Sequence, residues 1–151
     1  MAASVSDRLE LADLAYAYAA ALDERDVAAF AALFTEDAHL GVYEPGSERP
    51  LLGYDGRAQI ADAVALLDPY GETMHVVSNH RVSVDGDQAT GVVYCLAHHT
   101  TVRDDAPHNL VMTIRYYDRY ERGVEGWRFA HRKIVRFWNE LRPLLDERAA
   151  F

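Results

Sequence analysis

The sequence predicts an α+β fold in which three N-terminal helices pack on a curved, largely antiparallel sheet, with an internal pocket between the two layers. Before residue 68 apolar residues recur at helical spacing, whereas from Glu72 onward the pattern changes to long extended stretches. The turns between these stretches are too short for crossover helices, so adjacent strands should be antiparallel. With 151 residues, 50% of them hydrophobic, and no shift in composition, residues 1–151 are expected to form one domain.

Three segments carry the helical pattern. Asp7-Arg8-Leu9-Glu10 has the form of a capping box and predicts a helix that ends near Asp23. Asp26 is a suitable N-cap for a second helix over residues 27–34. A third helix is predicted over residues 56–67, where a proline soon after the last apolar residue stops it.

The extended part begins with a short strand over residues 38–43, which an exposed loop over residues 44–50 follows. Alternating polar and apolar residues then predict four long strands, over residues 73–84, 88–102, 109–122 and 127–138. The tail, residues 139–151, is expected to add one short helix or to cover the mouth of the pocket.

The charge and the cysteine content exclude several classes of function. A formal net charge of −9 and a pI near 5.1 repel phosphate backbones, and the basic residues of segment 128–136 alternate with apolar ones. We therefore expect no nucleic-acid partner. The lone Cys95 excludes an intrachain disulfide framework and a thiolate metal cluster. No stretch approaches the roughly 18 apolar residues that a membrane span needs, and the N-terminus lacks the regions of a secretory signal, so a cytoplasmic protein without membrane contact is expected.

Two polar residues far apart in the sequence are the strongest candidates for chemistry. Asp23 ends a Tyr- and Ala-rich helix, and His75 lies early in the apolar strand Met74-His75-Val76-Val77. A carboxylate that orients an imidazole in a dry pocket is sufficient for general acid/base catalysis without a cofactor. The alternatives are a solvated helix-terminal aspartate and a packed core histidine.

Neighbouring residues extend this candidate site. Tyr16 precedes Asp23 by seven residues and so shares its face on an ideal helix, whereas Tyr18 is rotated away. Counting by twos from Ala89 points His99 rather than His98 into the core, unless a bulge swaps them. The same alternation from Ile114 places two further pocket candidates on one face, namely Tyr116 and Asp118.

We expect no metal ion and no cofactor. Adjacent His98 and His99 cannot both reach one ion from a regular strand, and the spacing of a facial His/carboxylate triad is absent. No glycine-rich turn joins a strand to a helix, so a nucleotide site is not expected either.

Several phrases of the sequence together resemble a known family. They are Phe30-Ala-Ala-Leu33-Phe34-Thr-Glu-Asp37-Ala38, then Met74-His75-Val76-Val77-Ser78-Asn79 followed by Asp85-Gly86-Asp87-Gln88-Ala89, and the closing segment from Tyr116-Tyr-Asp118 to Trp127-Arg-Phe-Ala-His131-Arg132. In this order they resemble the SnoaL-like branch of the nuclear transport factor 2-like superfamily, which implies a cone-shaped fold. The superfamily includes dehydratases, isomerases, cyclases, dehydrochlorinases, oxygenase β subunits and non-catalytic binders.

The resemblance also implies roles for individual residues. Asp23 and His75 match the pair shared by enzymes similar to scytalone dehydratase, bile-acid dehydratase and lindane dehydrochlorinase, in which the histidine is the base. Tyr18 matches a pocket tyrosine of such enzymes, and Arg132 matches an arginine of the last strand that assists the leaving group. His99 matches a second histidine that holds the reacting water or oxygen; the alternative is a packed or interface histidine.

The expected function is thus a cofactor-independent lyase or isomerase of the dehydratase type, acting on a cyclic, largely apolar small molecule such as a polyketide, steroid or terpenoid. One alternative is an aldol polyketide cyclase of the SnoaL type. Another is a non-catalytic small-molecule binder, or a structural protein resembling an oxygenase β subunit. An apolar outward sheet face also predicts a homo-oligomer, either a dimer packed sheet to sheet or a trimer; this face is expected to carry Tyr94, Leu96, Tyr117, Val92 and Ile114.

Overall fold

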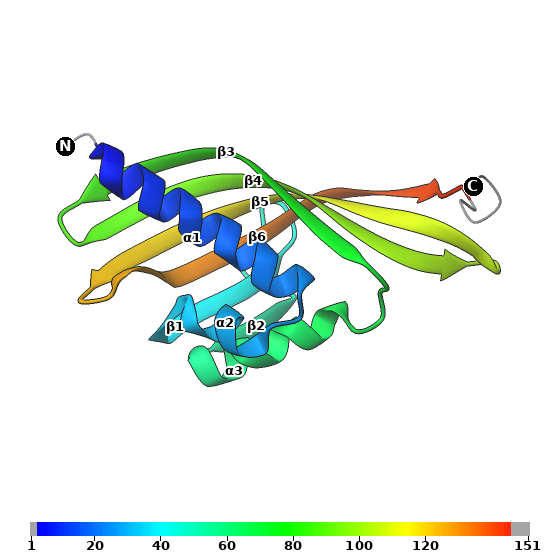
Figure 1. The fold of residues 1–151 in the computed structure, drawn as a ribbon, viewed down its shortest axis with the longest axis horizontal. Coiled ribbons are helices and arrows are strands. Elements are labelled where there is room, and N and C mark those ends of the chain that lie inside the picture. Colours follow the sequence, from blue (N-terminus) through cyan, green and yellow to red (C-terminus); the bar gives the residue numbers. More distant parts are fainter. Residues whose placement is uncertain (1–2, 146–151) are drawn as a thin grey trace.

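The computed structural model describes residues 3–145, which form one six-stranded curved sheet with helices on one of its faces (Figure 1). The α+β class is therefore confirmed. The helices are α1 (Val5–Asp23), α2 (Val27–Ala32), α3 (Arg57–Asp62) and the 3-10 helix η1 (Ala63–Leu67). The strands are β1 (Phe34–Tyr43), β2 (Leu52–Asp55), β3 (Thr73–Asp85), β4 (Gln88–Arg103), β5 (Ala106–Gly123) and β6 (Gly126–Pro143).

The strand order is β2-β1-β6-β5-β4-β3. Strands β3 to β6 form the predicted antiparallel meander, in which each strand pairs with the next. Strand β1 pairs with β6 in parallel, because the chain passes through α3 and the whole meander before it returns beside β1. The sequence did not predict β2, which has only four residues and no buried one, so it carries no alternation.

Helix α1 begins earlier than predicted. Ser4 is its N-cap, and the Ser4 side chain accepts a hydrogen bond from the backbone N–H of Asp7. Asp7 is therefore not the cap. Its buried carboxylate instead accepts hydrogen bonds from Arg122 Nη1 at 2.6 Å and from Trp127 Nε1 at 3.1 Å. These contacts attach the start of α1 to the β5–β6 hairpin, a role that local sequence cannot reveal.

The second and third predicted helices are present, but their boundaries differ from the prediction. Asp26 caps α2 through the backbone N–H of Ala29, but the helix stops at Ala32 because Phe34 already pairs with Phe129 of β6. The predicted third helix is divided into α3 and η1. The short helix expected in the tail is wrong for residues 139–143, which continue β6, and residues 146–151 lie outside the described part of the chain.

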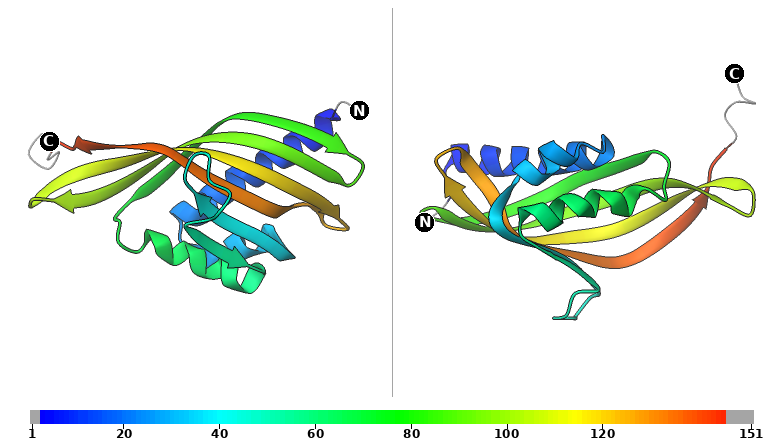
Figure 2. Two further views of the ribbon diagram at one scale, coloured as in Figure 1. Left: turned by 180° about the vertical axis from the view of Figure 1, so that it is seen from behind. Right: turned by 90° about the horizontal axis from the view of Figure 1, so that it is seen from below.

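The core lies between α1 and the sheet. Viewed from behind, strands β3 to β6 pass in front of α1, and the ends of β4, β5 and β6 extend beyond the helices as a long arm (Figure 2). The buried stripe of α1 consists of Leu11, Leu14, Ala15, Tyr18 and Leu22. Its side chains meet an aromatic cluster formed by Phe30, Phe34, Tyr116, Tyr120 and Phe129.

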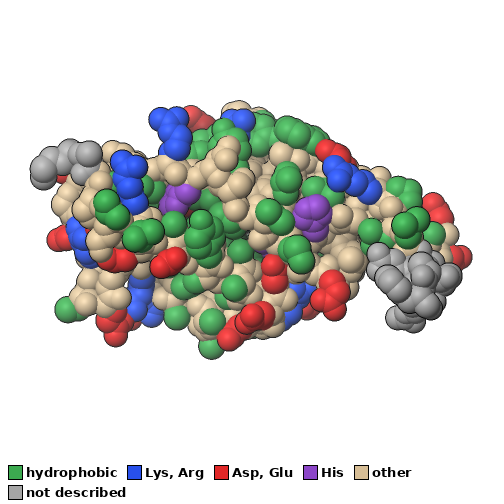
Figure 3. Space-filling model, turned by 45° about the horizontal axis from the view of Figure 1, so that its top comes forward, with side chains coloured by type: hydrophobic (Ala, Val, Ile, Leu, Met, Phe, Trp, Pro, Cys, Tyr) green, Lys and Arg blue, Asp and Glu red, His purple; other side chains and the backbone are tan. Residues whose placement is uncertain are grey.

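Strand alternation was predicted correctly for β4, where Ala89, Gly91, Val93, Cys95, Ala97 and His99 are all buried. On the opposite face Tyr94, Leu96 and Tyr117 are 36%, 44% and 37% exposed. The placement of Ile114 on that outer face was wrong, because Ile114 alternates with Tyr116 and is buried. Acidic and basic side chains are interspersed on the surface that Figure 3 displays. Within residues 3–145 no helix combines the length and the hydropathy that a membrane crossing requires.

Candidate active site

Asp23 and His75 form a hydrogen-bonded pair although 52 residues separate them in the sequence. Asp23 is the last residue of α1, and His75 is near the start of β3. His75 Nδ1 lies 2.6 Å from Asp23 Oδ1, and the backbone N–H of His75 donates to Oδ2 at 2.9 Å. Since the carboxylate oxygen is an acceptor, Nδ1 carries the proton and Nε2 keeps a free lone pair. The side chain of His75 is 6% exposed, and that of Asp23 is 23% exposed.

The Asp23 carboxylate is held by a third donor that sequence reasoning missed. Thr73 Oγ1 donates to Asp23 Oδ1 at 3.0 Å, and Arg25 Nη1 donates to Thr73 Oγ1 at 2.8 Å. Arg25 adopts a left-handed backbone conformation with φ of 57°, which turns the chain immediately after α1. The sequence does not indicate this left-handed turn at Arg25, because the left-handed region favours glycine or asparagine over arginine.

Arg25 also connects the dyad to the segment that closes the pocket. Its Nη2 donates to the carbonyl of Gly71 at 3.2 Å, and Nη1 donates to the carbonyl of Leu22 at 3.0 Å. Between η1 and β3, the Tyr70 ring packs against the His99 ring in a tilted arrangement, with ring centroids 4.6 Å apart. One guanidinium therefore links the end of α1, the Tyr70 segment and the start of β3, and fixes their relative positions.

Removal of the Thr73 hydroxyl should loosen this arrangement. Because a hydrogen bond to a charged group contributes about 1.5–3 kcal/mol, we expect Thr73→Val to lower the free energy of unfolding by an amount in or just below that range. Thr73→Ser should retain most of the stability, and Thr90→Val at an exposed position of β4 is the matched control. Urea denaturation measures all three. A Thr73→Val protein as stable as the Thr90→Val control would contradict this role.

A cavity of about 240 Å³ lies against His75. Its walls are mostly apolar and come from α1, α2, the β1–β2 region, η1 and the inner face of the sheet. The polar side chains that line it are Tyr18, Tyr54, Tyr70, His75, His99, Tyr116 and Arg136. An apolar cavity with a few convergent polar groups is the usual form of a small-molecule site.

His99 faces the core, as the alternation predicted, and the structure brings it beside the dyad. It is 2% exposed, and its ring centroid is 5.7 Å from that of His75. His99 Nδ1 donates to the carbonyl of Leu110 at 3.3 Å, which leaves Nε2 as an acceptor. Burial lowers the pKa of His99, so the neutral form is favoured and can hold a hydroxyl group or a water molecule.

The two tyrosines of α1 lie opposite to the expectation from ideal helix geometry, whereas the family resemblance had already implied that Tyr18 is the pocket tyrosine. Tyr18 is 2% exposed and lines the cavity, whereas Tyr16 is 54% exposed and does not. The buried stripe of α1 passes through Tyr18 and Leu22, and Asp23 reaches β3 through its hydrogen bonds rather than through a place on that stripe. Burial raises the pKa of Tyr18 to about 12 and that of Tyr116 well above its ordinary value, so both phenols remain hydrogen-bond donors.

Arg132 and Asp118 lie behind the cavity wall rather than in it. Arg132 is fully buried, and its Nε and Nη2 donate to the two Asp118 oxygens at 2.9 Å and 2.7 Å. Its guanidinium carbon is 4.1 Å from the ring centres of Tyr18, Tyr116 and Phe129. Burial alone would lower the pKa of Arg132, but the Asp118 carboxylate more than offsets this and holds it above the ordinary value. The prediction that Asp118 lines the pocket is therefore wrong for this cavity, because its ion pair with Arg132 holds it within the core.

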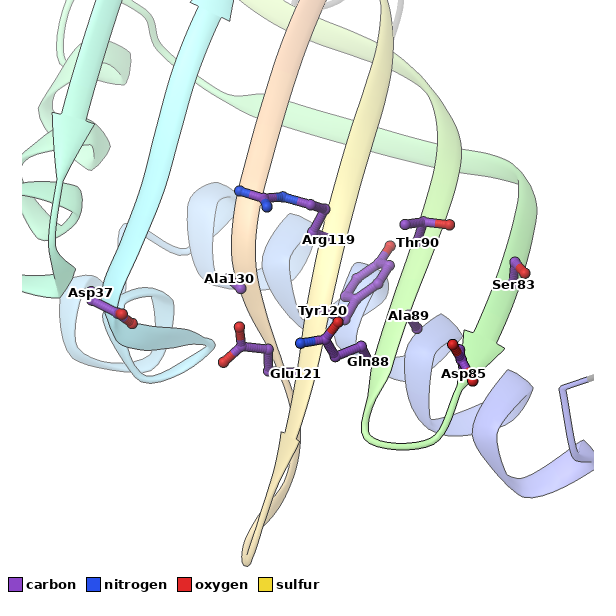
Figure 4. A pocket seen from close by; sticks show the side chains of 10 residues that line it. All are labelled: Asp37, Ser83, Asp85, Gln88, Ala89, Thr90, Arg119, Tyr120, Glu121 and Ala130. Carbon is purple, nitrogen blue, oxygen red and sulfur yellow. The ribbon is translucent and has the colours of Figure 1, made fainter. Parts of the chain in front are cut away.

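A second hollow of about 320 Å³ lies near the β3–β4 turn (Figure 4). It is lined by Asp37, Ser83, Asp85, Gln88, Ala89, Thr90, Arg119, Tyr120, Glu121 and Ala130. Most of these side chains are exposed, and none belongs to the dyad or its neighbours, so the smaller apolar cavity is the candidate site. Within residues 3–145, no three His, Cys, Asp or Glu side chains lie close enough together to hold a metal ion.

Three histidines should make stability depend on pH. Burial is the largest cause that lowers the pKa of His80, His99 and His131 below 6.5. The unfolded chain then binds more protons than the folded one as pH falls through 6.5, so the free energy of unfolding should decrease below that pH and level off below the folded pKa values. Urea denaturation at pH 7.5 and 5.5 measures the decrease, which His99→Gln should reduce. Equal stability at both pH values would contradict the assignment.

The fold is an α+β fold with a curved sheet, and an aspartate on a helix pairs with a histidine on a strand. Together with the family match, these features define a protein of the nuclear transport factor 2-like superfamily. Within it, residues 3–133 match the SnoaL-like domain, and the chain belongs to that family. Uncharacterized proteins of Mycobacterium tuberculosis and Mycobacterium bovis are each 32% identical over 132 residues, which cover 86% of this chain and 85% of theirs.

Solved structures share the fold. A protein of Novosphingobium aromaticivorans provisionally described as an aromatic ring hydroxylase is 26% identical, with a TM-score of 0.77 over 95% of this chain and 97% of that one. A provisionally described scytalone dehydratase of the same species is 20% identical, with a TM-score of 0.77 over 90% and 87% of the two chains. A hexachlorocyclohexane dehydrochlorinase of Novosphingobium barchaimii is 21% identical, with a TM-score of 0.76 over 94% and 92%. The last two show similarity of fold alone.

Proposed function

We propose that this protein is a cofactor-independent acid/base enzyme, a lyase or isomerase that acts on a cyclic, largely apolar small molecule such as a polyketide, steroid or terpenoid. The observation that carries the proposal is the Asp23–His75 hydrogen bond at 2.6 Å, with the imidazole facing an apolar cavity. A paired imidazole whose other nitrogen faces a ligand cavity is the geometry that general base catalysis requires.

In the proposed reaction His75 Nε2 removes a proton from a carbon next to a carbonyl group or a leaving group. The electron pair of the broken C–H bond forms the new double bond, and the leaving group departs with its own bonding pair or the carbonyl oxygen becomes an enolate. Asp23 stabilises the imidazolium that forms. The Tyr18 and Tyr116 hydroxyls donate to the developing negative charge. Arg132 is a positioning residue here, because its guanidinium lies over the ring faces of Tyr18 and Tyr116 and so acts on the substrate only through these two phenols.

Exchange of carbon-bound hydrogen with solvent deuterium tests the proposal without knowledge of the natural substrate. Cyclic ketones and β-hydroxy-ketones with one to four rings are incubated in deuterated buffer and followed by NMR, so both enolisation and loss of water are detected. We expect at least one compound to exchange or eliminate water in the presence of the wild-type protein and not with His75→Ala. A series in which neither reaction exceeds the buffer rate, while the compounds bind, would favour a non-catalytic binder.

We also propose that the outer sheet face forms a homodimer. Tyr94, Leu96 and Tyr117 are partly exposed there, and within residues 3–145 no helix covers them. Light scattering at micromolar concentration should give a mass above that of a monomer. Leu96→Glu should shift this mass toward the monomer, whereas Leu9→Glu, on the exposed side of α1, should not. A wild-type monomer would contradict the proposal.

A further inference from the structure

The inner face of β6 carries two arginines with different surroundings. Arg132, Ile134 and Arg136 alternate onto this face; Arg132 is buried and paired with Asp118, whereas Ile134 and Arg136 line the cavity. Among residues 3–145, Arg136 has no ion-pair partner and no side-chain hydrogen bond. Of the side chains that line the cavity, Arg136 is the one that carries a permanent charge.

The strand register places Arg136 across the cavity from the dyad. His75 pairs with Ala97 of β4 and Ala97 with Met112 of β5, while Ile114, two residues further along β5, pairs with Arg136 of β6. Three strand spacings separate β3 from β6, so the two backbones are about 14 Å apart along the sheet. His75 and Arg136 both line the cavity of about 240 Å³, and the strand residues between them that also line it, Ala97, Met112 and Ile114, are apolar.

We propose that the ligand of this cavity is a ring compound that carries a carboxylate, and that Arg136 binds the carboxylate while His75 faces the ring. This inference deepens the proposed function, since it names the acidic class of substrate. A guanidinium binds a carboxylate through two parallel hydrogen bonds, which fixes the direction as well as the position of the ligand. With a formal net charge of −9 the protein as a whole repels anions, so selection for an acid depends on a local cation.

The binding arrangement has a consequence for the chemistry. If Arg136 holds the carboxylate at one side of the cavity, the carbon that faces His75 is determined by the length of the ring system. The apolar walls contributed by Met112, Ile114 and Ile134 would then contact the ring itself. Substrate selection and proton abstraction would thus be carried out by different strands, β6 and β3.

Binding of matched acids and amides tests the inference. The probes are one-, two- and three-ring carboxylic acids, each paired with its primary amide, and calorimetry at pH 7.5 gives the dissociation constants. We expect the acid to bind about tenfold to a hundredfold more tightly than the amide for at least one pair, which is the range of a charge-assisted hydrogen bond. Arg136→Gln should abolish the preference and Arg136→Lys should retain part of it.

Two control variants separate this inference from the catalytic proposal. Arg115→Gln removes a cation that lies over Tyr94 and Phe137 on the outer face, so the preference for acids should be unchanged. His75→Ala should retain the preference for acids even though it greatly lowers the rate of proton abstraction. A series in which no acid binds more tightly than its amide, or in which Arg136→Gln keeps the preference, would overturn the inference and leave the proposed role of His75 intact.

Discussion

His75→Ala is expected to lower the rate of proton abstraction by about 10² to 10⁴, the usual contribution of a positioned general base. Asp23→Asn should also cause a large loss, because an amide neither stabilises the imidazolium nor enforces protonation at Nδ1. The deuterium exchange assay measures both effects. His80→Gln, which alters a half-buried histidine of β3 that does not line the cavity, is the control and should retain the wild-type rate.

The pH profile adds a readout that a structural role would not alter. A general base must be unprotonated to accept a proton, so wild-type exchange should be slower in acid than at neutral pH. A near wild-type rate in His75→Ala would show that His75 is a packed core residue and that any chemistry lies elsewhere.

Asp118→Ala is expected to destabilise the protein by about 3–5 kcal/mol, the usual cost of leaving one partner of a buried ion pair without the other. Arg132 is fully buried and both of its hydrogen bonds to a carboxylate go to Asp118, so the variant would leave its charge in the core without a counter-ion. Tyr120 Oη also donates to Asp118 Oδ2 at 2.8 Å and would lose its acceptor. Urea denaturation measures the change in the free energy of unfolding.

Two further variants make this expectation specific. Asp87→Ala removes an exposed partner of Arg122 and should cost no more than about 1 kcal/mol. The double variant Asp118→Leu with Arg132→Met replaces the pair by apolar groups and should recover most of the lost stability. An Asp118→Ala protein within about 1 kcal/mol of wild type would show that the ion pair is not critical. If the double variant folds but loses exchange activity, Arg132 acts on the phenols as proposed.

Much of the fold was predictable because it follows from local periodicity. The alternation that begins at Ala89 depends only on the period of a strand, and it correctly placed His99 in the core next to the dyad. The helical stripe and the N-cap Asp26 are equally local signals. Asp23 and His75 became candidates because one is a carboxylate at a helix end, the other is a histidine in an apolar strand, and both match a pair shared by similar enzymes; their catalytic role remains a proposal.

Long-range contacts account for what the sequence did not predict. Asp7 has the form of a helix cap, yet its carboxylate binds Arg122 and Trp127, more than a hundred residues away. Tyr16 and Tyr18 differ by only two positions, and which of them reaches the cavity depends on the rotation of α1 against the sheet. Strand β2 forms because β1 offers it an edge, since its own residues carry no alternation.

The sequence by itself determined the class of fold and the order of the long strands, because periodicity is a local property. It offered Asp23 and His75 as candidates through their residue types and the family resemblance. The tertiary structure alone decided which partners the charged side chains have and how deeply they are buried. It buried Arg132 against Asp118, turned Arg136 toward the cavity, and joined Arg25 to Thr73 beside the dyad. The physical reason is that sequence periodicity does not identify the partner of a charged side chain. Its burial and its ion pair are settled only when strands and helices that are distant in the sequence pack together.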